Sequence, residues 1–214
     1  MSYTKIIIIA LLLALIYVSI KLARTQNIVK SNSQPAQPSN EEAVYENILT
    51  RTSVRVYQDK AVDSKKIERL LRAGMAAPSA ADKRPWHFVV ITDPEKLSGL
   101  ATANPNAGFA KKAPLAIVVC GDMSKALEGG GRDFWIQDCS AASENILLEA
   151  HAMGLGAVWT GTYPSKERCE AVAKVLNLPD HLVPLNTIVI GYPANEVQPK
   201  DKWDKSNVTY FTGE

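Results

Sequence analysis

The chain has 214 residues, of which 46% are apolar and 21% charged, and its formal net charge at pH 7 is +2. This is enough for one sizeable globular domain and a tail. So small a net charge gives no argument for nucleic acid or acidic lipid as a partner, and no basic block with interleaved aromatic residues is present.

The first predicted element is an apolar N-terminal segment. Residues 6–20, IIIIALLLALIYVSI, are uncharged, but fifteen residues fall short of the roughly 20 that a membrane-spanning helix needs. Lys21, Leu22 and Ala23 extend the run, because a lysine stem can snorkel to the membrane surface. We therefore interpret residues 1–23 as an uncleaved membrane anchor. A cleaved secretory signal and a buried helix are the alternatives, and a lysine where small residues precede a cleavage site argues against cleavage.

Basic residues around this segment predict its orientation. Lys21, Arg24 and Lys30 follow it, whereas Lys5 and the amino terminus precede it. The positive-inside rule then favours a cytoplasmic domain, with export after signal cleavage as the alternative.

A polar stretch separates this segment from the rest of the chain. Residues 24–41, RTQNIVKSNSQPAQPSNE, are rich in Ser, Asn, Gln and Pro and cannot bury a core. We interpret them as a linker, so the folded domain is expected to cover residues 42–214.

Within the domain, helical and strand-like patterns alternate. Periodic apolar residues follow a capping residue, either Asp63 or Ser64, and the Asp93-Pro94-Glu95 sequence is a second helix start signal. Helices are expected over 62–77, from 94 onward, over 133–153 with a stop at Gly154, and over 165–175. Strands are expected over 86–92, 114–120 and 185–190, with 208–211 as a candidate fourth. This order indicates an α+β fold and not the βαβ alternation of a doubly wound dinucleotide fold.

The glycine-rich stretches do not match nucleotide-binding loops. GLGAVWTG, residues 154–161, has Trp159 where a third glycine is required, and it follows a predicted helix instead of a strand. Gly129–Gly131 lacks the Lys-Ser/Thr of a phosphate loop and is interpreted as a surface turn. No serine lies in a G-x-S-x-G elbow, and no carboxylate pair marks a cleft. We therefore expect no catalytic side chain and a site whose bound cofactor does the chemistry.

The sulfur and imidazole groups give no metal pattern. Cys120, Cys139 and Cys169 are widely spaced and odd in number, so they predict neither a disulfide framework nor a zinc site. The three histidines lie near no cysteine pair. We interpret the cysteines as small apolar packing residues and expect no metal.

RTSVR, residues 51–55, is the clearest candidate for anion binding. Arg51 and Arg55 offer fork-shaped donors to a phosphate dianion, and Ser53 adds a hydroxyl. Taken alone, the stretch is better explained as a solvated arginine pair at a helix end.

Four segments together change that interpretation. They are RTSVR at 51–55, PSAADKRPW at 78–86, GLGAVWTG at 154–161 and PKDKWDKSNV at 199–208. In this order and spacing they resemble the nitroreductase-like flavoproteins, over residues 50–211. Each motif alone is unspecific, whereas the four together are specific.

The resemblance implies a fold and an activity. The implied fold is α+β, a central, mainly antiparallel sheet flanked by helices, in an intertwined homodimer with one FMN at each of two interface sites. The implied activity is hydride transfer from NADH or NADPH to the flavin and then to a nitroaromatic, quinone or similar small acceptor, with protons supplied by water.

The resemblance also implies cofactor-binding residues: Arg51, Ser53 and Arg55 at the phosphate and ribityl chain, Pro78, Ser79 and Ala80 from the other subunit, Trp159, Thr160 and Gly161 at the ring, and Lys200 and Lys202 closing on the phosphate. At Lys202 many relatives carry arginine, and lysine keeps the charge without the fork. Asp82 and Arg84 also depart from the family pattern, which has Asn and Gln there. An aspartate near a reduced, anionic flavin is unfavourable unless it is paired, and Lys83 and Arg84 are the candidate partners of Asp82.

Two other functions remain as alternatives. One is a dehalogenase or flavin-modifying enzyme of the same family, although residues 101–113 are short for a substrate lid and lack a matching acid, tyrosine and lysine set. The other is a membrane-tethered protein that holds flavin without turnover.

Overall fold

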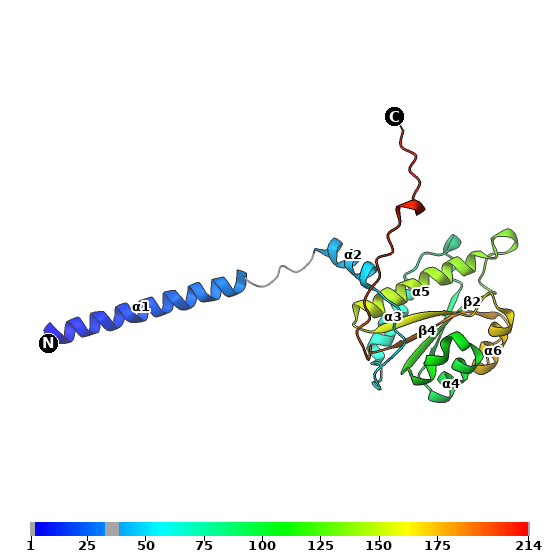
Figure 1. Ribbon diagram of the computed structural model, residues 1–214, viewed down its shortest axis with the longest axis horizontal. Helices are drawn as coiled ribbons and strands as arrows, with labels where there is room; N and C mark the ends of the chain where they lie inside the picture. The colour runs from blue at the N-terminus through cyan, green and yellow to red at the C-terminus, as the bar shows by residue number, and fades with distance from the viewer. Residues whose placement is uncertain (1–2, 33–38, 214) are drawn as a thin grey trace. The chain divides into compact units, whose positions relative to one another are not determined.

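A computed structural model describes residues 3–32 and 39–213 of the chain (Figure 1). It divides the chain into two compact units, residues 1–43 and 44–214. The second unit carries the sheet and all the residues of the candidate site.

The first unit consists of helix α1, Tyr3–Asn32, and the first residues of α2. Among the described residues, no helix is both long and apolar enough to cross a membrane. The prediction of a transmembrane anchor in residues 1–23 is therefore wrong, and so is the membrane-anchored location inferred from it, together with the orientation argument. The physical reason is length: the uncharged run of fifteen residues ends at Lys5 and Lys21, short of the roughly 20 that a span requires.

The stretch interpreted as a linker is described only in part. Residues 24–32 continue α1 as helix, and residues 33–38 lie outside the described residues.

The second unit is built on a four-stranded sheet. Its strands are β1 (Trp86–Ile91), β2 (Leu115–Asp122), β3 (Gly156–Gly161) and β4 (Leu182–Gly191). They lie in the order β1-β2-β4-β3, and every neighbouring pair is antiparallel. The predicted α+β class with an antiparallel sheet is confirmed.

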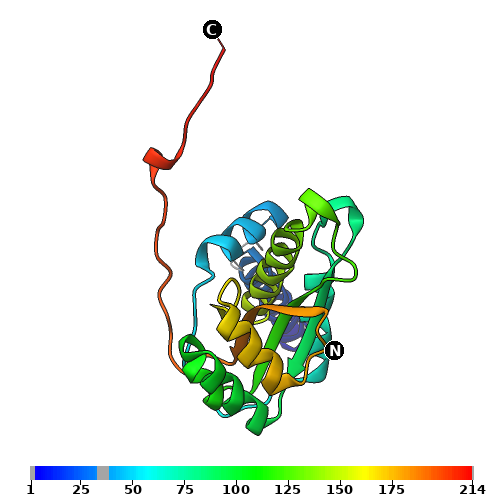
Figure 2. The ribbon, with the colours of Figure 1, turned by 90° about the vertical axis from the view of Figure 1, so that its right-hand side faces the viewer.

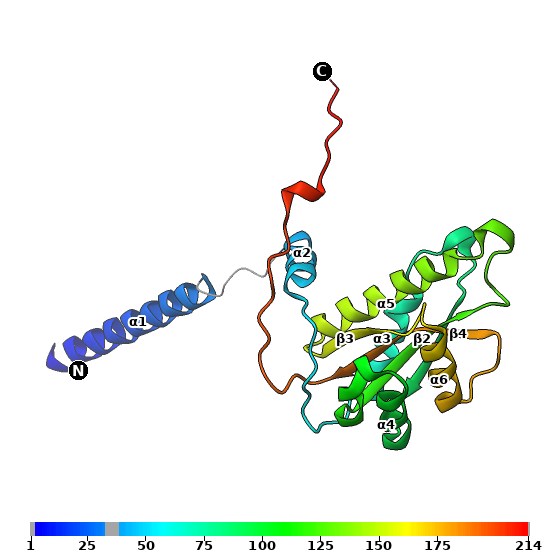
Figure 3. The ribbon, with the colours of Figure 1, turned by 45° about the vertical axis from the view of Figure 1, so that its right-hand side comes forward.

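Helices cover both faces of this sheet. They are α3 (Ser64–Met75), α4 (Pro94–Ala103), α5 (Phe134–Ala152) and α6 (Lys166–Leu176), whereas α2 (Asn40–Thr50) precedes the first strand and has no buried residue. In Figure 3, α3 and α5 lie on one face and α4 and α6 on the other. Because side chains alternate along a strand, Ile117 of β2 packs towards α5, whereas its neighbour Val118 packs towards α4 and α6. Burial on both faces explains why β2 is apolar nearly throughout.

The predicted helix start signals are confirmed. The Asp63 and Asp93 carboxylates accept hydrogen bonds from first-turn backbone amides of α3 and α4, and the Ser165 hydroxyl does the same for α6. Gly154 follows α5 with φ of +71°, a conformation in which a Cβ is disfavoured. Each boundary therefore has a local cause that the sequence makes visible.

The prediction of a strand at 208–211 is wrong, and β3 is the strand that the sequence pattern missed. Residues 208–211 lie in an extended, largely exposed arm that follows β4 (Figure 2). Ala157–Thr160 has the composition of a strand, but the glycine at each end of it is typical of a loop, so the pattern does not indicate a strand. Gly156 is needed for packing, since a Cβ there would lie 2.6 Å from Val54 Cβ.

The cysteines occupy packing positions. Cys120 and Cys139 are fully buried, and all three thiols are free. Burial raises the pKa of Cys120 to about 12 and raises the pKa of Cys139 and Cys169 as well. The thiols are therefore protonated near neutral pH, in line with the predicted packing role.

Candidate functional site

The RTSVR stretch leaves the end of α2 and runs beside the edge strand β3. The Val54 amide donates to the Ala157 carbonyl oxygen at 3.1 Å, and Ser53 pairs with Ala157 in a parallel bridge. The end of α2 is tied to α5 by the Asn47 side-chain amide, which donates to the Leu148 carbonyl oxygen at 3.1 Å. The stretch is thus fixed on both sides, by a helix and by the sheet edge.

Arg51 is held in a partly buried position beside α5. Its Nε lies 3.3 Å from a Glu144 carboxylate oxygen, and its side chain is 18% exposed. His151 is next to it, and burial together with the Arg51 guanidinium lowers the pKa of this histidine. Thr50 Oγ1 donates to the Glu46 carbonyl oxygen, so it accepts from His151 Nε2 at 2.9 Å. The imidazole is then neutral near pH 7 and positions the end of α2 without adding charge.

A polar cavity of about 330 Å³ lies between RTSVR and the chain after β4. Its lining residues are Arg51, Thr52, Ser53, Arg55, Val197, Gln198, Lys200 and Lys202. The lining contains four cationic side chains and no carboxylate. Across residues 3–32 and 39–213, no ion pair joins Arg55, Lys200 or Lys202 to an acid. Such a donor set fits a phosphate dianion.

The three predicted ring contacts on β3 play different parts. Trp159 is half-buried and packs against the main core, and Thr160 is buried with its hydroxyl donating to the Thr187 carbonyl oxygen at 2.8 Å. Both side chains are therefore occupied inside the fold. Of the three residues, Gly161 has the most open surroundings.

Gly161 is a glycine that the fold itself does not require. Its φ is not in the left-handed region, and a Cβ built on it would meet nothing closer than Tyr163 O at 4.0 Å. By contrast, Gly156 and Gly191 face side-chain atoms within 3.0 Å of such a Cβ. The absence of side chains around this position is compatible with close approach of a bound group to the backbone, and the contact with the flavin ring stays a prediction.

The phosphate-type cavity and the open glycine lie at opposite ends of β3. Ser53 pairs with Ala157, and Gly161 is four residues further on, which is about 13 Å along an extended strand. An elongated ligand with a phosphate at one end and a flat ring at the other fits this layout. FMN is such a ligand, so the residues present fit the group that the resemblance implies.

The Pro78–Ala80 turn lies elsewhere in the chain, after α3. The Ala80 amide donates to Asp138 Oδ1 on α5 at 2.9 Å, and the Ser79 hydroxyl accepts from the Arg84 amide at 3.0 Å. These residues do not line the cavity described above. Their assignment to the flavin of a partner subunit stays a prediction.

The loop that follows this turn is strained. Ala81, Asp82 and Arg84 have φ of 49°, 54° and 49°, in the left-handed region, at a cost of roughly 1 kcal/mol or more each. The Arg84 guanidinium donates two hydrogen bonds to Asp82, which confirms the expected pairing and holds the pKa of that carboxyl below its usual value. Strain of this kind in non-glycine residues clusters at ligand sites.

Comparison with known proteins decides the family. The nitroreductase family model matches residues 48–104 and 100–192. The chain belongs to the nitroreductase family. A relative from Methanothermobacter thermautotrophicus, named as a candidate NADH dehydrogenase/NAD(P)H nitroreductase, is 45% identical over 165 residues, 77% of this chain and 85% of its own length.

Solved structures of the family agree. A candidate NADH dehydrogenase/NAD(P)H nitroreductase from Parabacteroides distasonis is 47% identical, with a TM-score of 0.75 over 80% of this chain and 99% of its own. An FMN-dependent nitroreductase from Clostridium difficile is 30% identical, with a TM-score of 0.72 over 79% of this chain and 99% of its own. Family membership makes this chain an oxidoreductase.

Three residues around the site of this nitroreductase were not predicted from the sequence. Thr52 and Gln198 line the cavity, and both lie inside or beside a quoted motif, so proximity alone would have found them. Asp138 is 6% exposed and holds the Ala80 amide. A carboxylate on the buried face of a predicted helix is the signal that would have singled it out.

Among the described residues, no group of three or more His, Cys, Asp or Glu side chains is placed to hold a metal ion. The candidate site consists of the cationic cavity and the open end of β3.

Proposed function

We propose that this nitroreductase binds FMN and uses NADH or NADPH to reduce small acceptors such as nitroaromatics or quinones. The observation that carries the proposal is the cavity in which Arg51, Ser53, Arg55, Lys200 and Lys202 meet without a carboxylate. Two distant stretches of chain, 51–55 and 197–202, supply these groups. The relatives named for NAD(P)H and FMN chemistry support the same function.

Each part of the chain has a distinct role in this proposal. Arg51 and Arg55 supply paired donors to the phosphate, and the two lysines add charge from the other side of the cavity. The open surface at Gly161 admits the ring close to the backbone. Bound FMN supplies the hydride chemistry between nicotinamide and acceptor. The protein supplies position and electrostatics.

A dehalogenase function finds no support in the segment that would form its lid. Residues 101–113 include the end of α4 and the 3-10 turn Pro105–Lys112. Ala107 and Ala110 are fully buried against Val158 and Val189 under the sheet. A segment packed in this way serves as core and is poorly suited to opening over a substrate.

The direct test is an absorption spectrum of the purified full-length chain, followed by anaerobic titration with NADH and NADPH. We expect a yellow protein whose flavin absorbance bleaches on titration and returns when a quinone or nitroaromatic is added. A colourless chain that FMN does not reconstitute would contradict the proposal. A flavin that is not reduced by either nicotinamide would instead favour binding without turnover.

We further propose a homodimer. No residue of α2 is buried, and its Val44 and Leu49 side chains are 62% and 55% exposed. The arm after β4 exposes Trp203 and Phe211 at 71% and 97%. Large apolar side chains exposed on a helix and an arm are typical of surfaces covered by a partner, and a second copy is the commonest partner.

Light scattering on the eluting protein tests this prediction. We expect twice the chain mass for the wild type and a shift towards the monomer mass when Leu49→Asp and Phe211→Asp are combined. Lys65→Asp, an exposed position on α3, is the matched control and should leave the mass unchanged. A wild-type chain that elutes at the monomer mass at micromolar concentration would overturn the homodimer.

A further inference from the structure

The carbonyl of Gly161 accepts two side-chain hydrogen bonds from separate elements. Asn104 Nδ2 at the end of α4 and Arg168 Nη1 in α6 each lie 3.0 Å from Gly161 O. Asn104 is fully buried, and its Oδ1 accepts from the Asn106 amide at 3.2 Å. Both ends of the Asn104 side chain are thereby fixed, so its donor has a defined direction.

We call the two hydrogen bonds from Asn104 and Arg168 to the Gly161 carbonyl oxygen the clamp. The clamp also sets the direction of the Gly161 N–H. In an antiparallel strand the N–H and C=O of one residue point to the same side, and the side alternates along the chain. The Gly161 carbonyl points away from β4, towards α4 and α6, so its N–H points off the free edge of β3 as well. The next amide, that of Thr162, returns to β4 and donates to Leu185 O at 3.0 Å, as the alternation requires.

We propose that Asn104 and Arg168 are positioning residues of the flavin site. By holding the Gly161 carbonyl, they aim the Gly161 N–H from the strand edge at the bound ring. The Arg168 guanidinium also places a positive charge beside that contact, on the same side of β3, which favours the reduced ring with its greater negative charge. This inference rests on the proposed function and adds two residues that lie outside all four sequence motifs.

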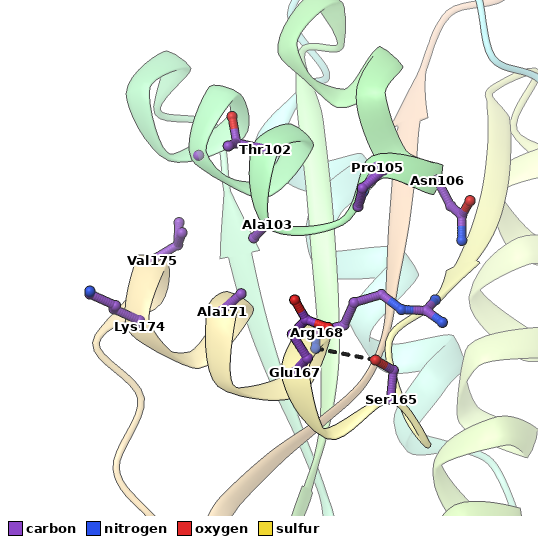
Figure 4. Close-up of a pocket in the computed structure, with 11 residues that line it drawn as sticks. Thr102, Ala103, Pro105, Asn106, Ser165, Glu167, Arg168, Ala171, Lys174 and Val175 are labelled. Atoms are coloured by element: carbon purple, nitrogen blue, oxygen red, sulfur yellow. Dashed lines mark hydrogen bonds between the residues drawn. The ribbon is translucent and has the colours of Figure 1, made fainter.

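The surroundings of Arg168 allow the idea to be tested without disrupting the fold. Arg168 is half-buried and borders a cavity of about 850 Å³ between α4 and α6, with Ala103 and Ala171 among its lining residues. In Figure 4 its guanidinium lies on the side of Asn106, away from Lys174. A shorter side chain at 168 therefore leaves the core intact. Arg168→Gln removes the charge and keeps amide donors, whereas Arg168→Lys keeps the charge.

The first measurement is the midpoint potential of FMN bound to the full-length protein, by equilibration with a reference dye. We expect Arg168→Gln to weaken the preference for reduced over oxidised FMN about tenfold, which is a fall of about 30 mV for a two-electron couple. Arg168→Lys should restore most of the potential. We expect kcat to fall with KM little changed, because the contact acts on the ring and not on the acceptor. Arg72→Gln, an exposed arginine of α3 paired with Glu68, is the control.

The second measurement uses the apoprotein, so that the clamp is judged independently of FMN. We expect amide hydrogen exchange at residues 160–163 to be faster in Arg168→Gln than in Arg72→Gln. Asn104→Ser should give the same local increase, and Arg168→Gln decides the matter if the buried Asn104 variant fails to fold. A chain that binds no FMN overturns the proposed function. In that case the hydrogen-exchange rates of the apoprotein still test whether Asn104 and Arg168 hold the Gly161 segment in place. Unchanged exchange, or an unchanged potential in a loaded Arg168→Gln protein, overturns this inference.

Discussion

Replacing Arg55 by alanine is expected to lower the affinity for FMN about tenfold or more. The loss of a hydrogen bond to a charged group typically costs about 1.5–3 kcal/mol, and about 1.4 kcal/mol is a factor of ten. Arg55 is exposed and lines the cationic cavity without an ion pair among the described residues, so its removal should leave the free energy of unfolding nearly unchanged. Titration of the apoprotein into FMN, followed by flavin fluorescence, gives the Kd.

Two controls make this result specific. Arg72→Ala removes the same charge from α3, where the arginine pairs with Glu68, and should leave the Kd for FMN unchanged. Riboflavin has the ring and ribityl chain without the phosphate, so Arg55→Ala should weaken FMN and leave riboflavin binding as it was. Equal losses for both ligands, or equal effects of the two substitutions, would place the phosphate elsewhere.

Replacing Gly156 by alanine is expected to destabilise the fold by about 1–3 kcal/mol, the usual cost of overpacking a core. The new Cβ would lie 2.6 Å from Val54 Cβ, and Val54 is only 6% exposed. Because Val54 belongs to RTSVR, the displacement should also weaken FMN binding. Urea unfolding followed by circular dichroism gives the free energy, and FMN titration gives the second effect.

Val54→Ala provides the matched test of this cause. It removes the two Val54 methyl groups that the new Cβ would meet at 2.7 and 2.8 Å and keeps the Val54 Cβ. The clash is relieved in part, so the double variant should be more stable than the sum of the two single losses predicts. Gly161→Ala is the comparison at the other end of β3, where a Cβ meets open space. It should keep the stability of the wild type and weaken FMN binding. A Gly156→Ala protein as stable as the wild type would show that the chain relaxes around the contact.

Local signals predicted most of the elements and failed where the cause was not local. Asp63, Asp93 and Ser165 mark helix starts because a side chain caps its own first turn. β3 was missed because glycines such as Gly156 and Gly161 are typical of loops. In the fold, Gly156 is a glycine because Val54 packs against it, and Gly161 faces open space beside the strand. The apolar N-terminal segment suggested a span because Lys21, Leu22 and Ala23 lengthen an uncharged run of fifteen residues towards the required length.

The candidate site shows the same division. Arg51, Ser53 and Arg55 follow from one short motif, since alternating side chains on an extended stretch share a face. Their meeting with Lys200 and Lys202 depends on contacts across nearly the whole domain, which no periodicity contains. Asn104 and Arg168 belong to no motif at all, and only the folded chain brings both to the Gly161 carbonyl.

The free edge of β3 has a consequence for the behaviour of the chain in solution. An exposed strand edge is a template to which a strand of another molecule can add, the route to edge-to-edge aggregation. Here the Ala157 carbonyl is already engaged by Val54, and that of Gly161 by Asn104 and Arg168. An incoming strand would have to displace these donors. The residues that shape the candidate site thereby also keep the sheet from growing.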